Sequence, residues 1–172
     1  MTNNKEYKEI LDVKLEHGAV INSGKFDFID YGYNYRLPEL QAVMGLKQLQ
    51  KLDEIISIRQ IIKESYIKNL AGLGFAEQKT DRNVFHNMQS IVFKVPDNIK
   101  RDDLVKHLKE NDIEATIGTY CLSDCTYYRK KYNNIQPVAK MLYDITITLP
   151  CYSGVDVELV LEKIRMYSSN EV

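Results

Sequence analysis

The residues best suited to binding chemistry lie in a polar and aromatic segment at 30–41, DYGYNYRLPELQ. The Asn34 amide can donate to a phosphate without adding charge, and the Arg36 guanidinium can contact a carboxylate or a phosphate through two N–H groups. The segment leads into a predicted helix N-terminus, where free N–H groups and the helix dipole favour anions. By itself the pattern therefore indicates a position suited to anion binding.

Both residues also have an ordinary structural interpretation. Asparagine near glycine commonly hydrogen-bonds its own backbone, so Asn34 fits a turn residue as well as a binding residue. Arg36 fits an ion pair with Asp30 or with Glu39, which lie a few positions away. The residue types alone leave both interpretations open.

Cysteine and histidine side chains offer two further kinds of chemistry. Cys121 and Cys125 are spaced C-x₃-C, but no second Cys or His pair stands at a metal-ligand spacing. Two reduced thiols are therefore expected, and no metal. His86 precedes a predicted strand, and from its residue type alone it is expected to be a structural histidine with satisfied hydrogen bonds.

The N-terminal third of the sequence predicts helices separated by a loop. Residues 5–16 place apolar side chains at helical spacing, and Gly18 suits a left-handed C-terminal cap. Between 19 and 35 the periodicity is lost, so a loop is expected there. Pro38 suits the first turn of a helix, and apolar residues then recur three or four apart as far as residue 70. One long helix or a kinked pair is expected.

The remainder predicts strands alternating with helices. The expected elements are a strand at 89–95, a helix at 101–110, a strand at 113–119, a helix at 136–143, an extended piece at 145–150 and a last helix capped by Asp156. We find no repeat, no low-complexity tract and no flexible linker. The predicted fold class is therefore α+β, a few strands covered by helices.

Bulk composition excludes several classes of function. With 172 residues, the chain can bury a core without disulfide or metal staples. Its 23 Lys and Arg residues nearly balance 24 Asp and Glu residues, so we expect no nucleic acid partner and no anionic membrane. Three cysteines and the lack of a long apolar run favour a cytoplasmic protein.

Five longer segments carry a family resemblance. They are HGAV, DFIDYGYNYRLPELQAVMGLKQLQKLDEII, RNVFHNMQSIVFKV, RDDLVKHLKENDIEATIGTY and ITITLPCYSGVDVELVLEKIR. In this order and spacing they resemble the DegT/DnrJ/StrS family of pyridoxal-phosphate-dependent aminotransferases, which aminate keto sugars carried on nucleotides. The resemblance implies the C-terminal part of a fold-type I enzyme. Residues 1–36 would then be the end of the large domain plus a phosphate loop, and 37–172 the small domain.

The resemblance also implies which site residues are present. The family's Schiff-base lysine would lie upstream of Met1, and no lysine here matches its position, so the chain is expected to contribute no catalytic residue and not to transaminate alone. Asn34 would contact the phosphate of a cofactor bound by the neighbouring subunit of a dimer. Tyr33 and Arg36, beside that cleft, and His86 would contact the substrate.

The connection that follows residue 117 departs from the family pattern. Family members with a G-T-Y turn, here 118–120, often have a histidine shortly afterwards, where this chain has Ser123. Because that histidine is missing, the departure weakens the inference that this connection binds the sugar. Its tyrosines Tyr127, Tyr128 and Tyr132 fit stacking on a sugar or base, and they fit half-buried packing equally well.

These inferences predict the C-terminal portion of an aminotransferase that uses an amino acid donor, expected to be glutamate, and a keto nucleotide sugar. Two alternatives are half of a split enzyme completed by a separate lysine-bearing chain, and a non-catalytic dimerisation or binding remnant. The expected partners are accordingly a second copy of the chain or a lysine-domain polypeptide.

Overall fold

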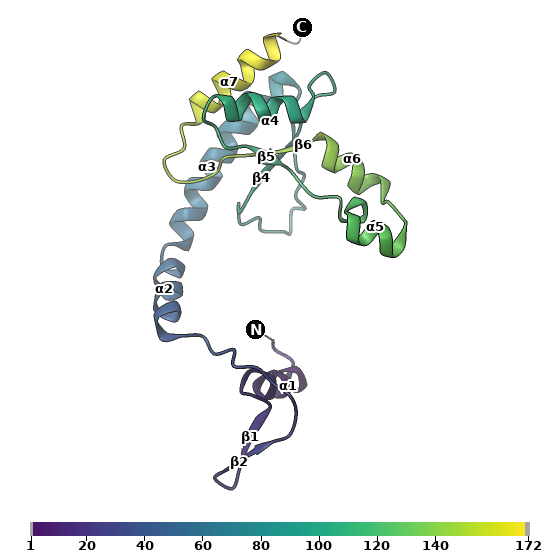
Figure 1. Ribbon diagram of the computed structural model, residues 1–172. Coiled ribbons are helices and arrows are strands. Elements are labelled where there is room, and N and C mark those ends of the chain that lie inside the picture. Colours follow the sequence, from purple (N-terminus) through teal and green to yellow (C-terminus); the bar gives the residue numbers. More distant parts are fainter. Residues whose placement is uncertain (1, 171–172) are drawn as a thin grey trace. The chain divides into compact units, whose positions relative to one another are not determined.

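The computed structural model describes residues 2–170 and divides the chain into two compact units, Met1–Lys51 and Leu52–Val172 (Figure 1). The first unit contains helix α1 (Lys5–Leu15), strands β1 (Ala19–Asn22) and β2 (Lys25–Phe28), and helix α2 (Glu39–Leu49). All other elements belong to the second unit. The domain boundary at residue 36, which rests on the family comparison, stays a prediction.

The first predicted helix is confirmed as α1. The Asn4 side chain caps it by accepting a hydrogen bond from the Tyr7 N–H at 3.2 Å. Gly18 has a φ of +77°, and its N–H donates to the Val13 carbonyl at 2.8 Å. Gly18 therefore supplies the left-handed conformation that was predicted where the helix ends.

The loop predicted at 19–35 is wrong for residues 19–28, which form an antiparallel hairpin. Strands β1 and β2 pair from Ala19 opposite Phe28 to Asn22 opposite Lys25. Ser23 and Gly24 connect them with φ values of +48° and +79°, as a two-residue type I′ turn requires. Each strand has only four residues, too few for a clear alternation of polar and apolar side chains.

The stretch predicted as one long helix or a kinked pair is divided in the structure, so a single uninterrupted helix is excluded. Two helices, α2 and α3 (Leu52–Leu70), occupy this stretch, and Gln50 is the C-terminal cap of the first. Pro38 is the N-cap of α2 and not a residue of its first turn, because its ψ of 145° is extended. Glu39 follows at the first helical position, where its charge suits the helix dipole.

The second unit contains a four-stranded antiparallel sheet. Its order is β3 (Ala76–Glu77), β4 (Ile91–Lys94), β6 (Thr146–Leu149), β5 (Thr116–Ile117). Helix α4 (Arg101–Glu110) lies between β4 and β5 in sequence, as predicted. The strand predicted at 113–119 pairs only over two residues, and β3 was not predicted because a two-residue strand has no period.

One face of this sheet forms the core. Ile91, Phe93, Ile147 and Leu149 alternate along β4 and β6 and are all buried. They pack in one cluster with side chains of α3, α4 and α7 (Val157–Asn170), which Figure 1 shows on the same side of the sheet. The α+β fold class is therefore confirmed.

The remaining helices are α5 (Thr126–Tyr132) and α6 (Pro137–Ile145), with short 3-10 turns at Ala71–Leu73 and Leu122–Asp124. Helix α5 lies within the tyrosine-rich connection and was not predicted. Asp156 caps α7 as predicted, because its side chain accepts from the Leu159 N–H at 3.0 Å. Among residues 2–170, no helix combines the length and the apolar character needed to cross a membrane.

Candidate functional site

The Asn34 segment is held by the chain that follows α1. Glu16 and Asn34 form an antiparallel bridge, flanked by hydrogen bonds from the His17 N–H to the Tyr33 carbonyl at 2.9 Å and from the Tyr35 N–H to the Leu15 carbonyl at 3.2 Å. In such a pair the two facing side chains stand close together on one face. Asn34 therefore projects beside Glu16 from a backbone that is fixed on both sides.

A close backbone crossing sets this geometry. A Cβ atom on Gly32 would lie 2.1 Å from the Gly18 nitrogen, and one on Gly18 would lie 1.7 Å from the Asp30 carbonyl oxygen. Real Cβ atoms never approach so closely, so the crossing requires glycine at both positions. Gly18 and Gly32 thereby bring the segment after the hairpin against the end of α1.

Arg36 is engaged by Glu16. Its Nε donates to both Glu16 carboxylate oxygens, at 2.9 and 2.8 Å, and its Nη2 donates to Oε2 as well. These hydrogen bonds lower the pKa of Glu16 and raise the pKa of Arg36. The ion-pair partner is neither Asp30 nor Glu39, and the Asp30 carboxylate accepts from the Lys14 Nζ at 2.6 Å instead.

Tyr33 lies on the other face of the same extended segment. Side chains alternate along an extended strand, so Asn34 and Arg36 share the Glu16 face while Tyr33 and Tyr35 face away from it. The Tyr33 and Tyr35 rings stack with centroids 4.9 Å apart. The structure thus brings Arg36 to the Asn34 face and does not bring Tyr33 there. The substrate role of Tyr33 stays a prediction.

The Asn34 amide is exposed, and it makes no hydrogen bond to any other group within residues 2–170. Backbone hydrogen bonds and the two glycines hold the turn, so it does not depend on the Asn34 side chain. The amide donors are consequently available to a ligand. Nearby, Glu16 and Arg36 border a cavity of about 690 Å³, which the hairpin lines with apolar side chains that include Phe26 and Phe28.

His86 belongs to the second unit and is half-buried. Its Nδ1 accepts a hydrogen bond from the Met88 N–H at 3.0 Å, and the Met88 carbonyl accepts from the Arg59 Nη1 at 3.2 Å. An accepting Nδ1 leaves Nε2 as the protonated nitrogen of the neutral ring. Nε2 has no partner among the described residues. One ring nitrogen is thus structural, and the other can donate.

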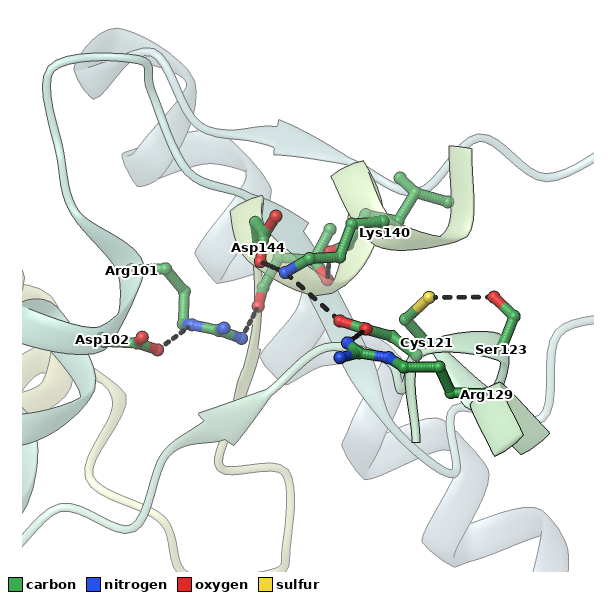
Figure 2. Close-up of polar contacts among 10 residues, drawn as sticks. Arg101, Asp102, Cys121, Ser123, Arg129, Lys140 and Asp144 are labelled. Carbon is green, nitrogen blue, oxygen red and sulfur yellow. Dashed lines mark hydrogen bonds and ion pairs between the residues drawn. The ribbon is translucent and has the colours of Figure 1, made fainter. Parts of the chain in front are cut away.

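The polar network around α5 and α6 is drawn in Figure 2. The Asp124 carboxylate pairs with Arg129 and lies 3.8 Å from the Lys140 Nζ, which also binds Asp144 at 2.6 Å. Arg101 is buried, and its Nη1 donates to the Thr146 carbonyl at 3.0 Å. These contacts tie α5 to α6, and α4 to β6.

The C-x₃-C cysteines lie beside this network. Cys121 is buried, with its sulfur 3.3 Å from the Ser123 hydroxyl (Figure 2), and Cys125 is exposed. The Cys125 Sγ donates to the Cys121 carbonyl at 3.6 Å. Within the described part of the chain, no three His, Cys, Asp or Glu side chains gather as metal ligands would.

The sequence model of the DegT/DnrJ/EryC1/StrS aminotransferase family matches residues 1–165. This chain belongs to that family. A similar protein is the GDP-perosamine synthase of Escherichia coli O157:H7, 32% identical over 177 residues that cover 99% of this chain and 47% of the relative. The GDP-perosamine synthase of Vibrio cholerae is 32% identical over 105 residues, covering 60% of this chain and 29% of the relative.

Solved structures share the fold. The putative sugar aminotransferase Spr1654 of Streptococcus pneumoniae in its PMP form has a TM-score of 0.86 at 19% identity, covering 100% of this chain and 47% of that structure. Helicobacter pylori PseC, an aminotransferase of pseudaminic acid biosynthesis, has a TM-score of 0.87 at 18% identity, covering 98% and 48%. The chain thus spans about half the length of these relatives.

Pyridoxal phosphate is indicated as the cofactor of the complete enzyme by the family and by solved PLP and PMP forms of one neighbour. The exposed, unengaged amide of Asn34 fits a phosphate acceptor. Glu16 is a neighbour of this site that sequence reasoning missed. It lies 18 positions before Asn34, and no spacing signal links residues that meet only through a backbone crossing.

Proposed function

We propose that this chain is the C-terminal portion of a pyridoxal-phosphate-dependent aminotransferase. The complete enzyme transfers an amino group from an amino acid, expected to be glutamate, to a keto sugar carried on a nucleotide. The observation that carries the proposal is the family match over residues 1–165, with GDP-perosamine synthases among the relatives. Because the chain spans about half of such a relative, the activity belongs to a larger assembly, proposed to be a cytoplasmic dimer.

Five residues are proposed to contribute to the assembled site. Pyridoxal phosphate, when bound, supplies the electron sink for the amino transfer. Asn34 donates to its phosphate from the neighbouring subunit, and Arg36 orients an anionic part of the substrate while Glu16 holds the guanidinium in place. Tyr33 and His86 contact the substrate. The Asn34 amide and the His86 Nε2, neither of which has a partner within residues 2–170, support this assignment.

The lysine that links to the cofactor is proposed to come from the half of the family sequence that precedes these residues, so that this chain alone does not transaminate. A split enzyme, with a separate polypeptide carrying that lysine, is one form of the proposal. A non-catalytic dimerisation or binding remnant is the rival. Among the described residues 2–51, Gly18 is the only buried residue. Because this part of the chain has so little core of its own, the low burial favours an enzyme completed by another polypeptide segment.

Reconstitution tests the proposal. The chain is mixed with a polypeptide equivalent to the N-terminal half of the E. coli relative, and amino transfer to a keto nucleotide sugar is measured by mass spectrometry. Transfer is expected only in the mixture, with borohydride fixing the cofactor to a lysine of the added half. Cofactor fixed to a lysine of this chain would contradict the proposal, and inactivity of a mixture that forms a stable complex would favour the remnant.

A further inference from the structure

The turn from Cys121 to Cys125 contains two thiols that differ in exposure. Cys121 is buried, whereas Cys125 is exposed. The Asp124 N–H donates to the Cys121 carbonyl at 2.9 Å, and the Cys125 N–H donates to the Leu122 carbonyl at 3.0 Å, so the chain between the cysteines folds into one 3-10 turn. An exposed thiol can react with an oxidant from solution, and a second thiol nearby can then resolve the product. The turn therefore has the composition of a thiol pair that reacts in sequence.

The Cys125 sulfur already lies close to the other cysteine. Its Sγ is 3.6 Å from the Cys121 carbonyl oxygen. Because a carbonyl oxygen lies about 2.4 Å from the Cα atom of its own residue, the Cys125 sulfur is within about 6 Å of the Cys121 Cα. The Cys121 side chain is turned toward Ser123, with its sulfur 3.3 Å from the hydroxyl oxygen (Figure 2). A bond between the sulfurs thus requires Cys121 to leave Ser123 and rotate, and it requires no movement of a distant segment.

The same turn joins α5 to α6 through two of its side chains. The Ser123 hydroxyl accepts from the Gln136 N–H at 2.9 Å. The Asp124 carboxylate pairs with Arg129 of α5 and lies 3.8 Å from the Lys140 Nζ of α6 (Figure 2). Ser123 and Asp124 lie between the two cysteines in sequence, so a covalent bond that reshapes the turn displaces both groups. A disulfide here would therefore loosen the attachment of α5 to α6.

We propose that Cys121 and Cys125 form a reversible disulfide when the chain meets hydrogen peroxide, and that this bond loosens the attachment of α5 to α6. The Cys125 thiolate attacks one peroxide oxygen, the O–O bond breaks, and the products are a Cys125 sulfenic acid and hydroxide. The Cys121 sulfur, after losing its proton, then attacks the Cys125 sulfur, and the sulfenic oxygen leaves as water. In total the two thiols lose two electrons and two protons, and one peroxide becomes two water molecules. A thiol reductant reverses the step by exchange. This chemistry needs only the chain itself and does not depend on the proposed aminotransferase activity.

Peptide mass spectrometry of the chain, after treatment with hydrogen peroxide and then with iodoacetamide, tests the site. Cleavage by trypsin places both thiols in the peptide 110–129 and Cys151 in another peptide. The peptide 110–129 should be lighter by two hydrogen atoms and unalkylated, and dithiothreitol should restore alkylation at both of its cysteines. Cys125→Ser should abolish the protection of Cys121 from alkylation, and Cys121→Ser should leave a Cys125 sulfenic acid that dimedone traps. Cys151→Ser is the matched control and should change nothing, because burial raises the pKa of the Cys151 thiol and so disfavours its reactive thiolate.

Hydrogen exchange measures the effect of the disulfide on α5 and α6. Exchange of the Gln136 amide should quicken when peroxide acts on the parent chain, because the Ser123 hydroxyl that accepts from this amide is displaced. Peroxide should quicken it equally in Cys151→Ser and should leave it unchanged in Cys125→Ser.

Three outcomes would overturn the inference. They are full alkylation of both cysteines of peptide 110–129 after peroxide, a disulfide that joins either of them only to Cys151 or to a second chain, and unchanged Gln136 exchange in a chain that has the disulfide. Because Cys121 is buried, Cys121→Ala is a second variant in case Cys121→Ser does not fold. The results on the parent chain and on Cys125→Ser decide the inference if neither Cys121 variant folds.

Discussion

At the scale of single residues, Asn34 and Glu16 contribute in different ways to the same face. Asn34 offers donors that nothing in residues 2–170 uses, and it is held in place by backbone hydrogen bonds of its two neighbours, Tyr33 with His17 and Tyr35 with Leu15. Glu16 uses its carboxylate fully on Arg36. Substitution of Asn34 should therefore weaken ligand binding, and substitution of Glu16 should disturb the local structure.

The Asn34→Ala variant should separate binding from folding. One neutral donor to a charged acceptor contributes on the order of 1.5–3 kcal/mol, so cofactor affinity of the reconstituted pair should fall by roughly ten- to a hundredfold. The melting temperature of the isolated chain should hardly change, because exposed substitutions away from caps and core usually cost within about 0.5 kcal/mol. A large loss of stability with unchanged cofactor binding would instead make Asn34 a turn residue.

The Glu16 carboxyl should titrate below its usual pKa of 4.5, chiefly because Arg36 hydrogen-bonds its ionised form. A lowered folded pKa means that the pair stabilises the bridge fully above about pH 4.5, and that this contribution disappears as the pH falls through the folded value. Carbon-detected NMR titration of Glu16 measures the pKa, and hydrogen exchange at Tyr35 reports the bridge. Arg36→Gln should return the pKa toward 4.5, whereas Lys25→Gln should not; equal values in both variants would refute the assignment.

At the scale of elements, one crossing positions α1, the hairpin and the Asn34 segment. Gly18 is buried, has a positive φ, and leaves no room for a methyl group beside the Asp30 carbonyl. The crossing also places Glu16, the residue paired with Asn34, at the end of α1. The geometry of the candidate site thus depends on a residue that has no chemistry of its own.

Gly18→Ala should therefore disrupt the first unit. A side chain in this backbone conformation, with no space for its Cβ, is expected to cost more than about 1 kcal/mol. Gly45→Ala is the matched control, because nothing lies within 4 Å of a Cβ at that helical position. It should stabilise α2 by up to about 1 kcal/mol through helix propensity. Hydrogen exchange across residues 5–35 distinguishes the two variants. Equal protection of these amides in both variants would contradict the inference that the backbone crossing at Gly18 organises the first unit.

Elements with many periodic residues could be predicted from the sequence, and short ones could not. The helix at 101–110 and the last helix have an apolar stripe and, in the second case, a capping Asp156. The hairpin has four-residue strands, and β3 and β5 have two residues each. Such short strands are defined by the strands with which they pair, and their own composition does not identify them. Helix α5 has seven residues and its rings are exposed, which left no buried stripe to detect.

The candidate site was predictable only as a set of residue types. The family resemblance pointed to Asn34 and Arg36 together, and backbone alternation places both beside Glu16. The same alternation directs Tyr33 away from them, which no spacing argument could foresee for a segment expected to be a loop. A contact such as Glu16 with Arg36, formed between positions 20 apart, follows from the glycine crossing and not from any local signal.

At the scale of the whole molecule, the two units differ in how they are stabilised. The second unit has a continuous core of buried side chains from its sheet and three helices. In the first unit, the described residues bury only Gly18, and large apolar side chains such as Phe26, Phe28 and Leu40 are 73%, 69% and 74% exposed. Exposed apolar surface of this extent is typical of a face that binds another polypeptide.

The last prediction concerns what covers the exposed apolar surface of the first unit, which includes residues of α1, of the hairpin and of 31–49. We expect it to bind the lysine-bearing half of the enzyme, and to drive self-association when that half is absent. Phe28→Asp and Leu40→Asp should each weaken both associations about tenfold or more, because an unpaired carboxylate would be buried against the partner. Ile61→Asp, at a side chain 68% exposed on α3, should leave them unchanged. Sedimentation velocity measures self-association, and calorimetry measures affinity for the other half. A chain that stays monomeric at high concentration and has no affinity for that half would show that the exposed apolar residues of the first unit do not form a binding face.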